Sequence, residues 1–291
     1  MHRTDRPTLK VFCSRQEFLF DFVMSFFKER GMIEKLPLLK LVLVLMVFIV
    51  LPSARAALIA HDFFLTGTNP GLGQYTNGVS IVGQNPTIAG FSGAWVAVAS
   101  GNSLITNISL VYTNSLYPAG TGGAYTAFGN NSNSRFARYF DSSNPFNTNT
   151  TTTFYMSFLL RVTGYPSTNS YLAMDLYGGG FVDDNNRAFQ LGQSGYDDFT
   201  NSTIFAFRVN DNNSFIGNLG TLDTNVHLFL IKFALVTNTL GDSVTVWKDP
   251  SLANLNSDPS GGVTLSGFDF RPVDSLALAK YTTTTGTNSF D

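Results

Sequence analysis

The sequence predicts an all-β domain, either a sandwich or a barrel, and three observations favour this class. Beyond residue 56 no stretch keeps the apolar period near 3.6 residues that is typical of a helix. Short apolar or alternating runs recur instead, separated by clusters of Asn, Gly, Ser and Pro. The clearest pattern, at 225–250, predicts a β-hairpin with turn residues at 237–242 and a stop at Pro250. Both faces of its first arm are largely apolar, which indicates a central strand covered on both sides.

The first 56 residues are expected to be a leader rather than part of the fold. A lysine-flanked apolar run at 41–51 precedes Ala54 and Ala56, which are small residues of the kind that a signal peptidase reads. The run has 11 residues, fewer than the about 20 that span a bilayer, although an uncleaved anchor is the alternative. We predict an over-extended N-terminus at 1–31, a signal peptide at 32–56, and a secreted β-sandwich domain at 57–291.

The part of the chain after residue 56 carries a net negative charge. Nine of the 18 Lys and Arg residues and five of the 20 Asp and Glu residues precede residue 57, so nine cations and fifteen anions follow, a net charge of −6. This balance argues against nucleic acid or an anionic membrane as partner, because both select clustered Lys and Arg. The one cysteine, Cys13, and every Glu also precede residue 57. The predicted mature chain therefore has no disulfide, no thiol chemistry and only Asp as an acidic side chain.

About a dozen strands and one domain are expected along the mature chain. The first strand is expected at 58–64, followed by a loop at 66–78. The remaining expected strands are 91–98, 103–112, 136–140, 154–162, 171–177, 188–191, 204–209, the hairpin arms within 225–248, and 276–281. No closing strand is expected in the Thr-rich end, 281–291, so we expect an open sheet edge and a truncated C-terminus.

Four features carry a resemblance to a known group of proteins: the Ala54-Arg55-Ala56 end of the leader, the opening 57–64, the strand 154–161 and the hairpin 228–250. Together they resemble secreted bacterial proteins with a laminin-G-like or concanavalin A-like domain, often ending in a PEP-CTERM sorting signal. The resemblance implies a jelly-roll β-sandwich of two antiparallel sheets outside the cytoplasm, usually without a known catalytic role. The Pro-Glu-Pro signal itself is not in this sequence.

Catalytic motifs are not recognisable in the sequence. Glycoside hydrolysis normally uses two carboxylates flanking the bond, and the jelly-roll glucanases that this architecture resembles use Glu-rich motifs. The Asp pairs at 183–184 and 197–198 do not substitute, because neighbours on a strand point to opposite faces. The two remaining histidines, His61 and His227, are expected to be structural. We therefore predict that the protein is not an enzyme, with a glycan hydrolase or lyase as the alternative.

Calcium is the metal that the sequence favours, because hard cations take Asp, Asn and backbone oxygens. Two loop clusters offer such ligands, with Asp183, Asp184 and Asn186 in the first and Asp211 and Asn213 in the second. Neither cluster has the Gly and terminal Glu of an EF-hand loop. The alternative is that both clusters are solvated turns, which use the same residue types.

Carbohydrate binding would use aromatic faces together with hydrogen bonds from Asn and Asp. The candidates are Trp95, Tyr177, Tyr196 and Trp247. The alternative is that these rings belong to the core, because most aromatic side chains of a sandwich do.

The function predicted from these features is a secreted, non-enzymatic module that binds polysaccharide or an extracellular protein at the cell surface or in the matrix. A purely structural surface component is the second hypothesis, and a glycan-degrading enzyme is the third. Turnover of a bound polysaccharide separates the first from the third, whereas self-association without glycan binding favours the second.

Overall fold

The computed structural model describes only residues of the compact unit Leu58–Asp291. These are residues 60, 62, 64–99, 102–107, 110, 112, 124–128, 132–141, 144, 146, 151–162, 171–179, 186–194, 204–212, 214–237, 240–251, 257–282 and 288–290. The expected leader at 1–56 therefore lies outside the described residues. Within the described ranges, no helix has the length and apolar character that crossing a membrane requires.

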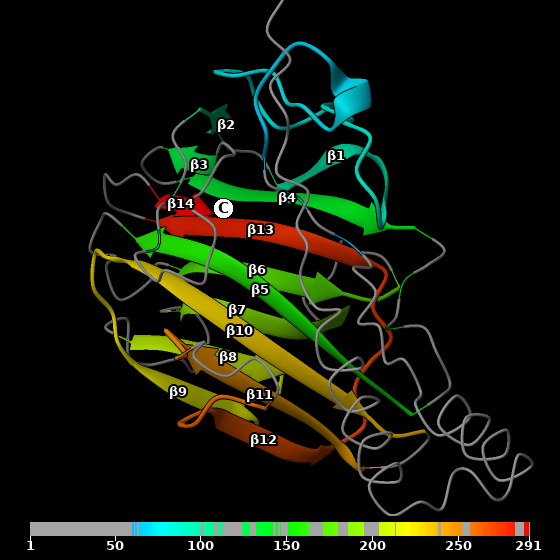
Figure 1. Cartoon of the computed structure of the whole chain (residues 1–291), viewed down its shortest axis with the longest axis vertical. Helices are drawn as coiled ribbons and strands as arrows, with labels where there is room; N and C mark the ends of the chain where they lie inside the picture. The colour runs from blue at the N-terminus through cyan, green and yellow to red at the C-terminus, as the bar shows by residue number, and fades with distance from the viewer. Residues whose placement is uncertain are drawn as a thin grey trace, which may run out of the picture. The chain divides into compact units, whose positions relative to one another are not determined.

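The described residues form fourteen strands in two seven-stranded antiparallel sheets, which lie one over the other (Figure 1). The β1–β9 sheet has the order β1-β4-β13-β6-β7-β8-β9, from β1 Phe91–Ala99, β4 Ser132–Phe140, β13 Ser275–Thr282, β6 Tyr171–Tyr177, β7 Arg187–Ser194, β8 Ile204–Val209 and β9 Ile216–Thr221. The β12–β2 sheet has the order β12-β11-β10-β5-β14-β3-β2, from β12 Val263–Phe268, β11 Asp242–Lys248, β10 Val226–Leu235, β5 Thr152–Val162, β14 Asn288–Phe290, β3 Ala124–Phe128 and β2 Asn102–Thr106. The predicted all-β sandwich is confirmed.

The core lies between the two sheets and is rich in Phe. On β10, Phe229, Ile231 and Phe233 are fully buried and point toward the β1–β9 sheet. Phe233 meets Phe189 of the facing sheet with ring centroids 5.3 Å apart and stacks on Phe154 of the neighbouring β5 at 5.0 Å. Burying one such side chain contributes about 1.5–3 kcal/mol. These ring contacts hold the two sheets together.

The predicted hairpin is confirmed as β10 and β11. Phe229 pairs with Lys248 at one end and Ala234 with Ser243 at the other, and β10 also pairs with β5 along its length. The Asp242 carboxylate accepts hydrogen bonds from the backbone N–H groups of Val236 and Phe270, at 2.6 Å each. Asp242 thereby fixes the turn of the hairpin to the segment that follows β12.

Four strands were not predicted, namely β3, β9, β12 and β14. The strands β9 and β12 are edge strands that contain Gly and alternate weakly, so their pattern resembles that of loops. The expectation that no strand closes the chain's end is wrong, because β14 pairs with both β5 and β3. Three residues are too few to give a readable alternation.

The prediction of a first strand at 58–64 is wrong for the residues that the structure describes there, because 60, 62 and 64 are not in a strand. Phe64 has a φ of 46°, and its N–H donates to the Asp62 side chain at 2.9 Å. This local bond turns the backbone away from an extended course. The loop expected at 66–78 contains one short 3-10 helix, Pro70–Leu72, capped by the Asn69 side chain.

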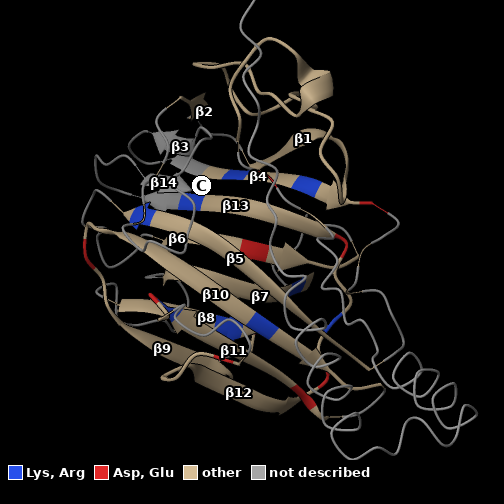
Figure 2. Ribbon diagram, in the orientation of Figure 1, with Lys and Arg blue, Asp and Glu red and all other residues tan. Residues whose placement is uncertain are grey.

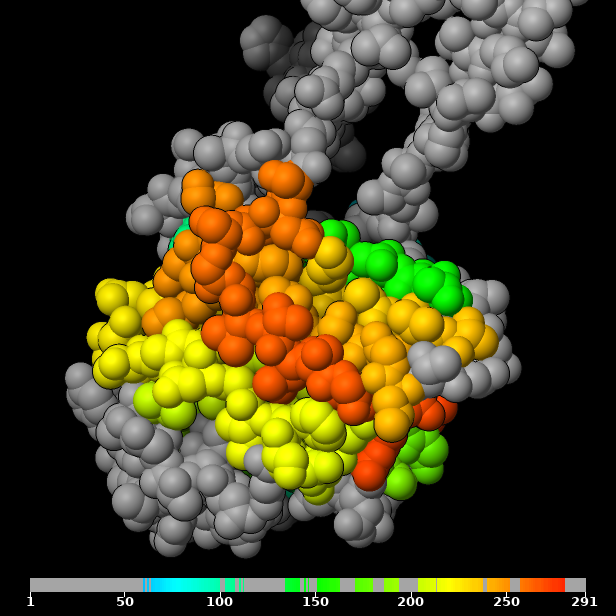
Figure 3. All heavy atoms as spheres, turned by 90° about the horizontal axis from the view of Figure 1, so that it is seen from below, coloured from blue at the N-terminus to red at the C-terminus, as the bar shows by residue number. Residues whose placement is uncertain are grey.

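The edge strands β9 and β12 of the two sheets lie against each other at one side of the sandwich. Phe215 and Phe268 meet edge to face there, 5.1 Å between centroids, and the Asn210 side chain bonds with the backbone of Asp269 and Arg271. Figure 3 shows this side, where the yellow segment around β9 adjoins the orange segment around and after β12. The segment that carries Arg271 therefore approaches the turn after β8.

Candidate functional site

Strand alternation separates two faces of the β1–β9 sheet. Along β6, Leu172, Met174 and Leu176 belong to the core, whereas Ala173, Asp175 and Tyr177 alternate to the face that points away from the other sheet. We call this the outer face. Figure 2 shows an acidic residue on β6 and basic residues on β4 and β8.

Asp175, Tyr177 and Arg187 form the centre of a polar cluster on the outer face. The Tyr177 hydroxyl donates to Asp175 Oδ2 at 2.9 Å, and Arg187 Nε donates to the Tyr177 hydroxyl at 3.2 Å. Arg187 Nε also lies 3.6 Å from Asp175 Oδ2 as an ion pair. Burial raises the pKa of Tyr177, and the nearby Asp175 charge adds to the rise, so the phenol stays protonated and acts as the donor.

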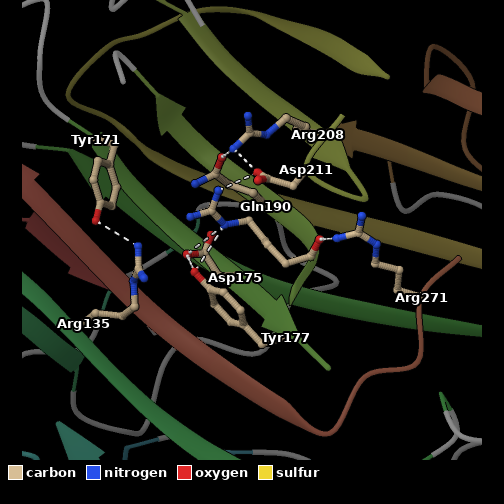
Figure 4. Close-up of polar contacts among 9 residues, drawn as sticks. Arg135, Tyr171, Asp175, Tyr177, Gln190, Arg208, Asp211 and Arg271 are labelled. Carbon is tan, nitrogen blue, oxygen red and sulfur yellow. Dashed lines mark hydrogen bonds and ion pairs between the residues drawn. The ribbon is translucent and has the colours of Figure 1, made fainter. Parts of the chain in front are cut away.

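Asp211 extends this cluster from the turn after β8. Its carboxylate lies 2.8 Å from Arg187 NH1 and 2.5 Å from Arg208 NH2. Asn210 and Asp211 have φ of 55° and 53°, the pair of positive values that a type I′ hairpin turn requires and that Asn and Asp tolerate. The Asn-Asp sequence therefore turns the chain so that Asp211 reaches two arginines (Figure 4).

We name the Asp175 cluster after its central residue. It consists of Asp175, Tyr177, Arg187, Gln190, Arg208 and Asp211. At one margin, Arg135 NH2 donates to the Tyr171 hydroxyl at 3.4 Å, and at the other, Arg271 NH1 donates to the Arg187 carbonyl at 3.5 Å. Figure 4 shows these groups converging from neighbouring strands.

The cluster is closed at its centre and reaches solvent at one margin. Asp175 and Tyr177 are fully buried, whereas the side chain of Asp211 is 21% exposed and Arg271 is exposed. Access to the cluster from solvent is therefore at the Asp211 and Arg271 margin.

One oxygen at the centre of the cluster has no partner. Asp175 Oδ1 is buried and makes no hydrogen bond in the described part of the chain. A buried acceptor left without a donor costs about 1–3 kcal/mol, and more when it is charged. Asp175 Oδ1 would therefore be stabilised by a hydrogen-bond donor that the described residues do not supply.

A row of small residues crosses the sheet directly beside Asp175. Ala279, Ala173, Gly192 and Ala206 lie opposite one another on four adjacent strands. A side chain at Gly192 would place its Cβ 2.0 Å from the Leu172 carbonyl oxygen, and its φ is 153°. Only glycine fits at this position of the row.

Two of the predicted sugar-stacking rings lie in the interior. Trp95 is 1% exposed and donates its Nε1–H to the Tyr75 hydroxyl at 2.8 Å, and Trp247 is 4% exposed and donates to the Pro259 carbonyl at 2.7 Å. Gly262 lies against the Trp247 indole. Neither ring has an exposed face, so a stacking role does not fit their positions. Tyr196 lies outside the described residues.

The same interior holds a buried acid beside Trp95. Tyr75 donates its hydroxyl to Asp62, and Arg138 NH1 lies 3.8 Å from the same carboxylate. Burial raises the pKa of Asp62 to about 6, although the bonds from Tyr75 and Phe64 and the Arg138 charge oppose the rise. This network ties the segment before β1 to β1 and β4.

Of the predicted calcium ligands, Asp211 faces two arginines and Asn186 precedes β7. Asp183, Asp184 and Asn213 lie outside the described residues. Among the residues that the structure does describe, no group of three or more His, Cys, Asp or Glu side chains gathers as a metal site would require. Calcium binding stays a prediction.

His227 is buried in β10, as expected, but its ring nitrogens are both engaged. Nδ1 lies 2.5 Å from Asp249 Oδ2, and Nε2 lies 2.9 Å from Asp223 Oδ1. Burial lowers the pKa of His227, but the bonds to Asp249 and Asp223 outweigh it and hold the pKa above its usual value. Hydrogen bonds from both ring nitrogens to these two aspartates therefore fix the orientation of the His227 ring at the start of β10. His61 lies outside the described residues.

Sequence reasoning missed most of the Asp175 cluster. Asp175 and Arg208 each stand as the one charged residue of an otherwise apolar strand, whereas Gln190 shares β7 with Arg187, Gln193 and Ser194. Such a residue at an alternate position of a buried strand is the signal that was available, since it marks the face opposite the core. Which of these residues meet depends on strand order, which the pattern does not give.

No protein-family model matches the chain, and no curated protein matches it. Solved structures similar to it include a carbohydrate esterase from the Shiga toxin-encoding bacteriophage phi24B. The two chains are 17% identical with a TM-score of 0.42, and the match covers 68% of this chain and 87% of the esterase chain. A GH131 β-glucanase catalytic domain from Podospora anserina has 8% identity, TM-score 0.41, and coverage of 79% and 98%. The Lotus tetragonolobus seed lectin has 12% identity, TM-score 0.36, and coverage of 68% and 91%.

These similarities show the β-sandwich jelly-roll fold alone. The prediction that the protein is not an enzyme is nevertheless corrected, because an esterase and a glucanase are among the similar structures. The missing Glu excluded one glucanase-like motif, and that was too narrow a ground for excluding catalysis. The structure also brings Asp175 and Asp211 to the same arginine from distant parts of the sequence, which adjacent Asp pairs did not suggest.

Proposed function

We propose that the protein binds a glycan and that the Asp175 cluster forms the binding site. The observation that carries this proposal is Asp175 Oδ1, buried and without a hydrogen-bond partner in the described residues. A sugar hydroxyl supplies the donor that this oxygen needs. An ordered water would supply one too, so the proposal is tested by binding.

The other members of the cluster suit the remaining hydrogen bonds of a sugar. Each sugar hydroxyl both donates and accepts, so its binding needs donors and acceptors side by side. Arg208 and Gln190 share a hydrogen bond of 3.3 Å, and Gln190 lies directly opposite Asp175 in the strand register.

We propose that this glycan is met outside the cytoplasm, at the cell surface or in the matrix. The leader-like pattern at 32–56 supports export. An extracellular protein that carries the glycan is an equivalent partner for the cluster.

The test is a glycan-binding panel with Asp175→Asn and a matched control, Asp258→Asn. Asp258 is an exposed aspartate that pairs with Lys232 at 2.5 Å, away from the cluster. Loss of a hydrogen bond to a charged group costs about 1.5–3 kcal/mol, so Asp175→Asn should weaken binding about tenfold to a hundredfold. The control should bind as the parent does. Parent-like binding by a folded Asp175→Asn variant contradicts the proposal.

A second candidate function is cleavage of the held glycan. One observation favours it: Asp175 and Asp211 both approach Arg187, so two carboxylates lie on one face. Glycoside hydrolysis commonly uses such a pair. Release of reducing ends that is lost in both Asp175→Asn and Asp211→Asn supports cleavage. A polysaccharide that binds but is never shortened contradicts it.

A further inference from the structure

We infer that the glycan is anionic and that its acidic group enters at the Arg271 margin; this inference rests on the proposed function. Nine Lys and Arg residues follow residue 56, in a stretch of net charge −6. Four of these nine, Arg135, Arg187, Arg208 and Arg271, belong to the Asp175 cluster or its margins. Four of the nine cations thus lie on or beside one sheet face, where Asp175 and Asp211 offset part of their charge.

The cations are spread along a line rather than gathered at a point. Arg135 is on β4 and Arg208 on β8, four strand positions apart in the sheet. At a strand spacing of about 4.8 Å, these positions are about 19 Å apart. Arg135, Arg187 and Arg208 are each at most 8% exposed, whereas Arg271 is exposed, so an acidic group that arrives from solvent reaches Arg271 first.

The guanidinium group is suited to the acidic group in question. Its planar fork matches a carboxylate or a sulfate through two parallel hydrogen bonds. Arg271 is exposed at the margin where Asp211 also reaches solvent, so it is the first cation that an incoming chain meets. Its NH1 lies 3.5 Å from the carbonyl of Arg187, which leads inward to Asp175.

The centre of the cluster suits the hydroxyl groups of the same sugar. Asp175 Oδ1 needs a donor, which a carboxylate or sulfate does not offer but a hydroxyl does. An acidic sugar carries both kinds of group on one ring. The hydroxyls would bond to Asp175 while the acidic group faces the arginines.

The test measures affinity for polygalacturonate, dextran sulfate and a neutral β-1,3-glucan at several salt concentrations. Arg271→Gln is the variant, and Lys248→Gln is the charge-matched control on the other sheet. Arg271 is exposed and Lys248 is partly exposed, so both charges reach solvent. We expect tightest binding to a polyanion, a steep loss of affinity with salt, and a weakening of about fivefold to tenfold by Arg271→Gln alone.

The outcomes separate this inference from the proposed function. Binding of polygalacturonate alone identifies carboxylate as the acidic group, and binding of both polyanions identifies anionic charge in general; either result supports the inference. Tight, salt-independent binding of the neutral glucan that is weakened by Asp175→Asn overturns the inference and leaves the proposed function standing. Polyanion binding that is weakened equally by Lys248→Gln overturns the inference, because the charge effect is then not local. A folded protein that binds none of the three glycans contradicts both.

Discussion

Replacing Asp62 with Asn should stabilise the protein at neutral pH and remove part of its pH dependence. The pKa of Asp62 rises from 3.8 to about 6 on folding, and 1.36 kcal/mol per pKa unit makes its ionised form about 3 kcal/mol unfavourable in the fold. Asn keeps an acceptor for the Phe64 N–H but loses the acceptor for the Tyr75 hydroxyl, and this loss costs about 1 kcal/mol of stability. We expect a net gain of about 1–2 kcal/mol at pH 8.

The sign of the pH dependence follows from proton binding. Between pH 3.8 and about 6 the folded state binds more protons at Asp62 than the unfolded state, so stability falls as the pH rises through this window. The Asn variant lacks this loss. The difference between variant and parent should therefore be small or negative near pH 4 and should grow in favour of the variant up to pH 7.

The assay is thermal or urea unfolding of both proteins from pH 4 to pH 8. For a domain of this size, 1 kcal/mol shifts the Tm by roughly 2–4 °C. Asp258→Asn serves as the control, because the hydrogen bond from Lys232 lowers the pKa of Asp258 and no gain is expected there. A Tm for Asp62→Asn below that of the parent at pH 8 would show that the ionised Asp62 carboxylate does not destabilise the fold.

Two further predictions concern the described fold. His227→Gln should destabilise the protein most below pH 6.5, because the raised pKa of His227 contributes stability there that is lost as the pH rises through the pKa of the folded state. Urea unfolding of variant and parent at pH 5.5 and pH 9 measures this difference. An equal loss of stability at both pH values contradicts the prediction. Gly192→Ala should destabilise by about 2 kcal/mol or more, since its Cβ would meet the Leu172 carbonyl, and a variant that melts with the parent shows that the sheet yields there.

The strongly patterned parts of the fold were predictable from the sequence. The hairpin of β10 and β11 has a long apolar arm and clear turn residues, and β6 and β8 match their predicted bounds, 171–177 and 204–209. Short or Gly-containing strands such as β14 and β9 were missed, because their alternation is too brief or too weak to separate from loops.

The candidate site was predictable only in part. Tyr177 and Asp211 were named from the sequence, but as a stacking ring and a calcium ligand, whereas the structure places both beside Arg187. Their partners come from β6, β7 and the turn after β8, and only strand order brings these together. The burial of Trp95 and Trp247 likewise depends on loops that pack over them, which composition alone does not place.

A crystal structure of the protein with a bound oligogalacturonide tests most directly whether the Asp175 cluster holds an acidic sugar. We expect a sugar hydroxyl within hydrogen-bond distance of Asp175 Oδ1 and the uronate carboxylate facing Arg271 or Arg208. An oligosaccharide bound elsewhere, for instance beside the exposed Tyr155 of the other sheet, with an ordered water on Asp175 Oδ1, would contradict it.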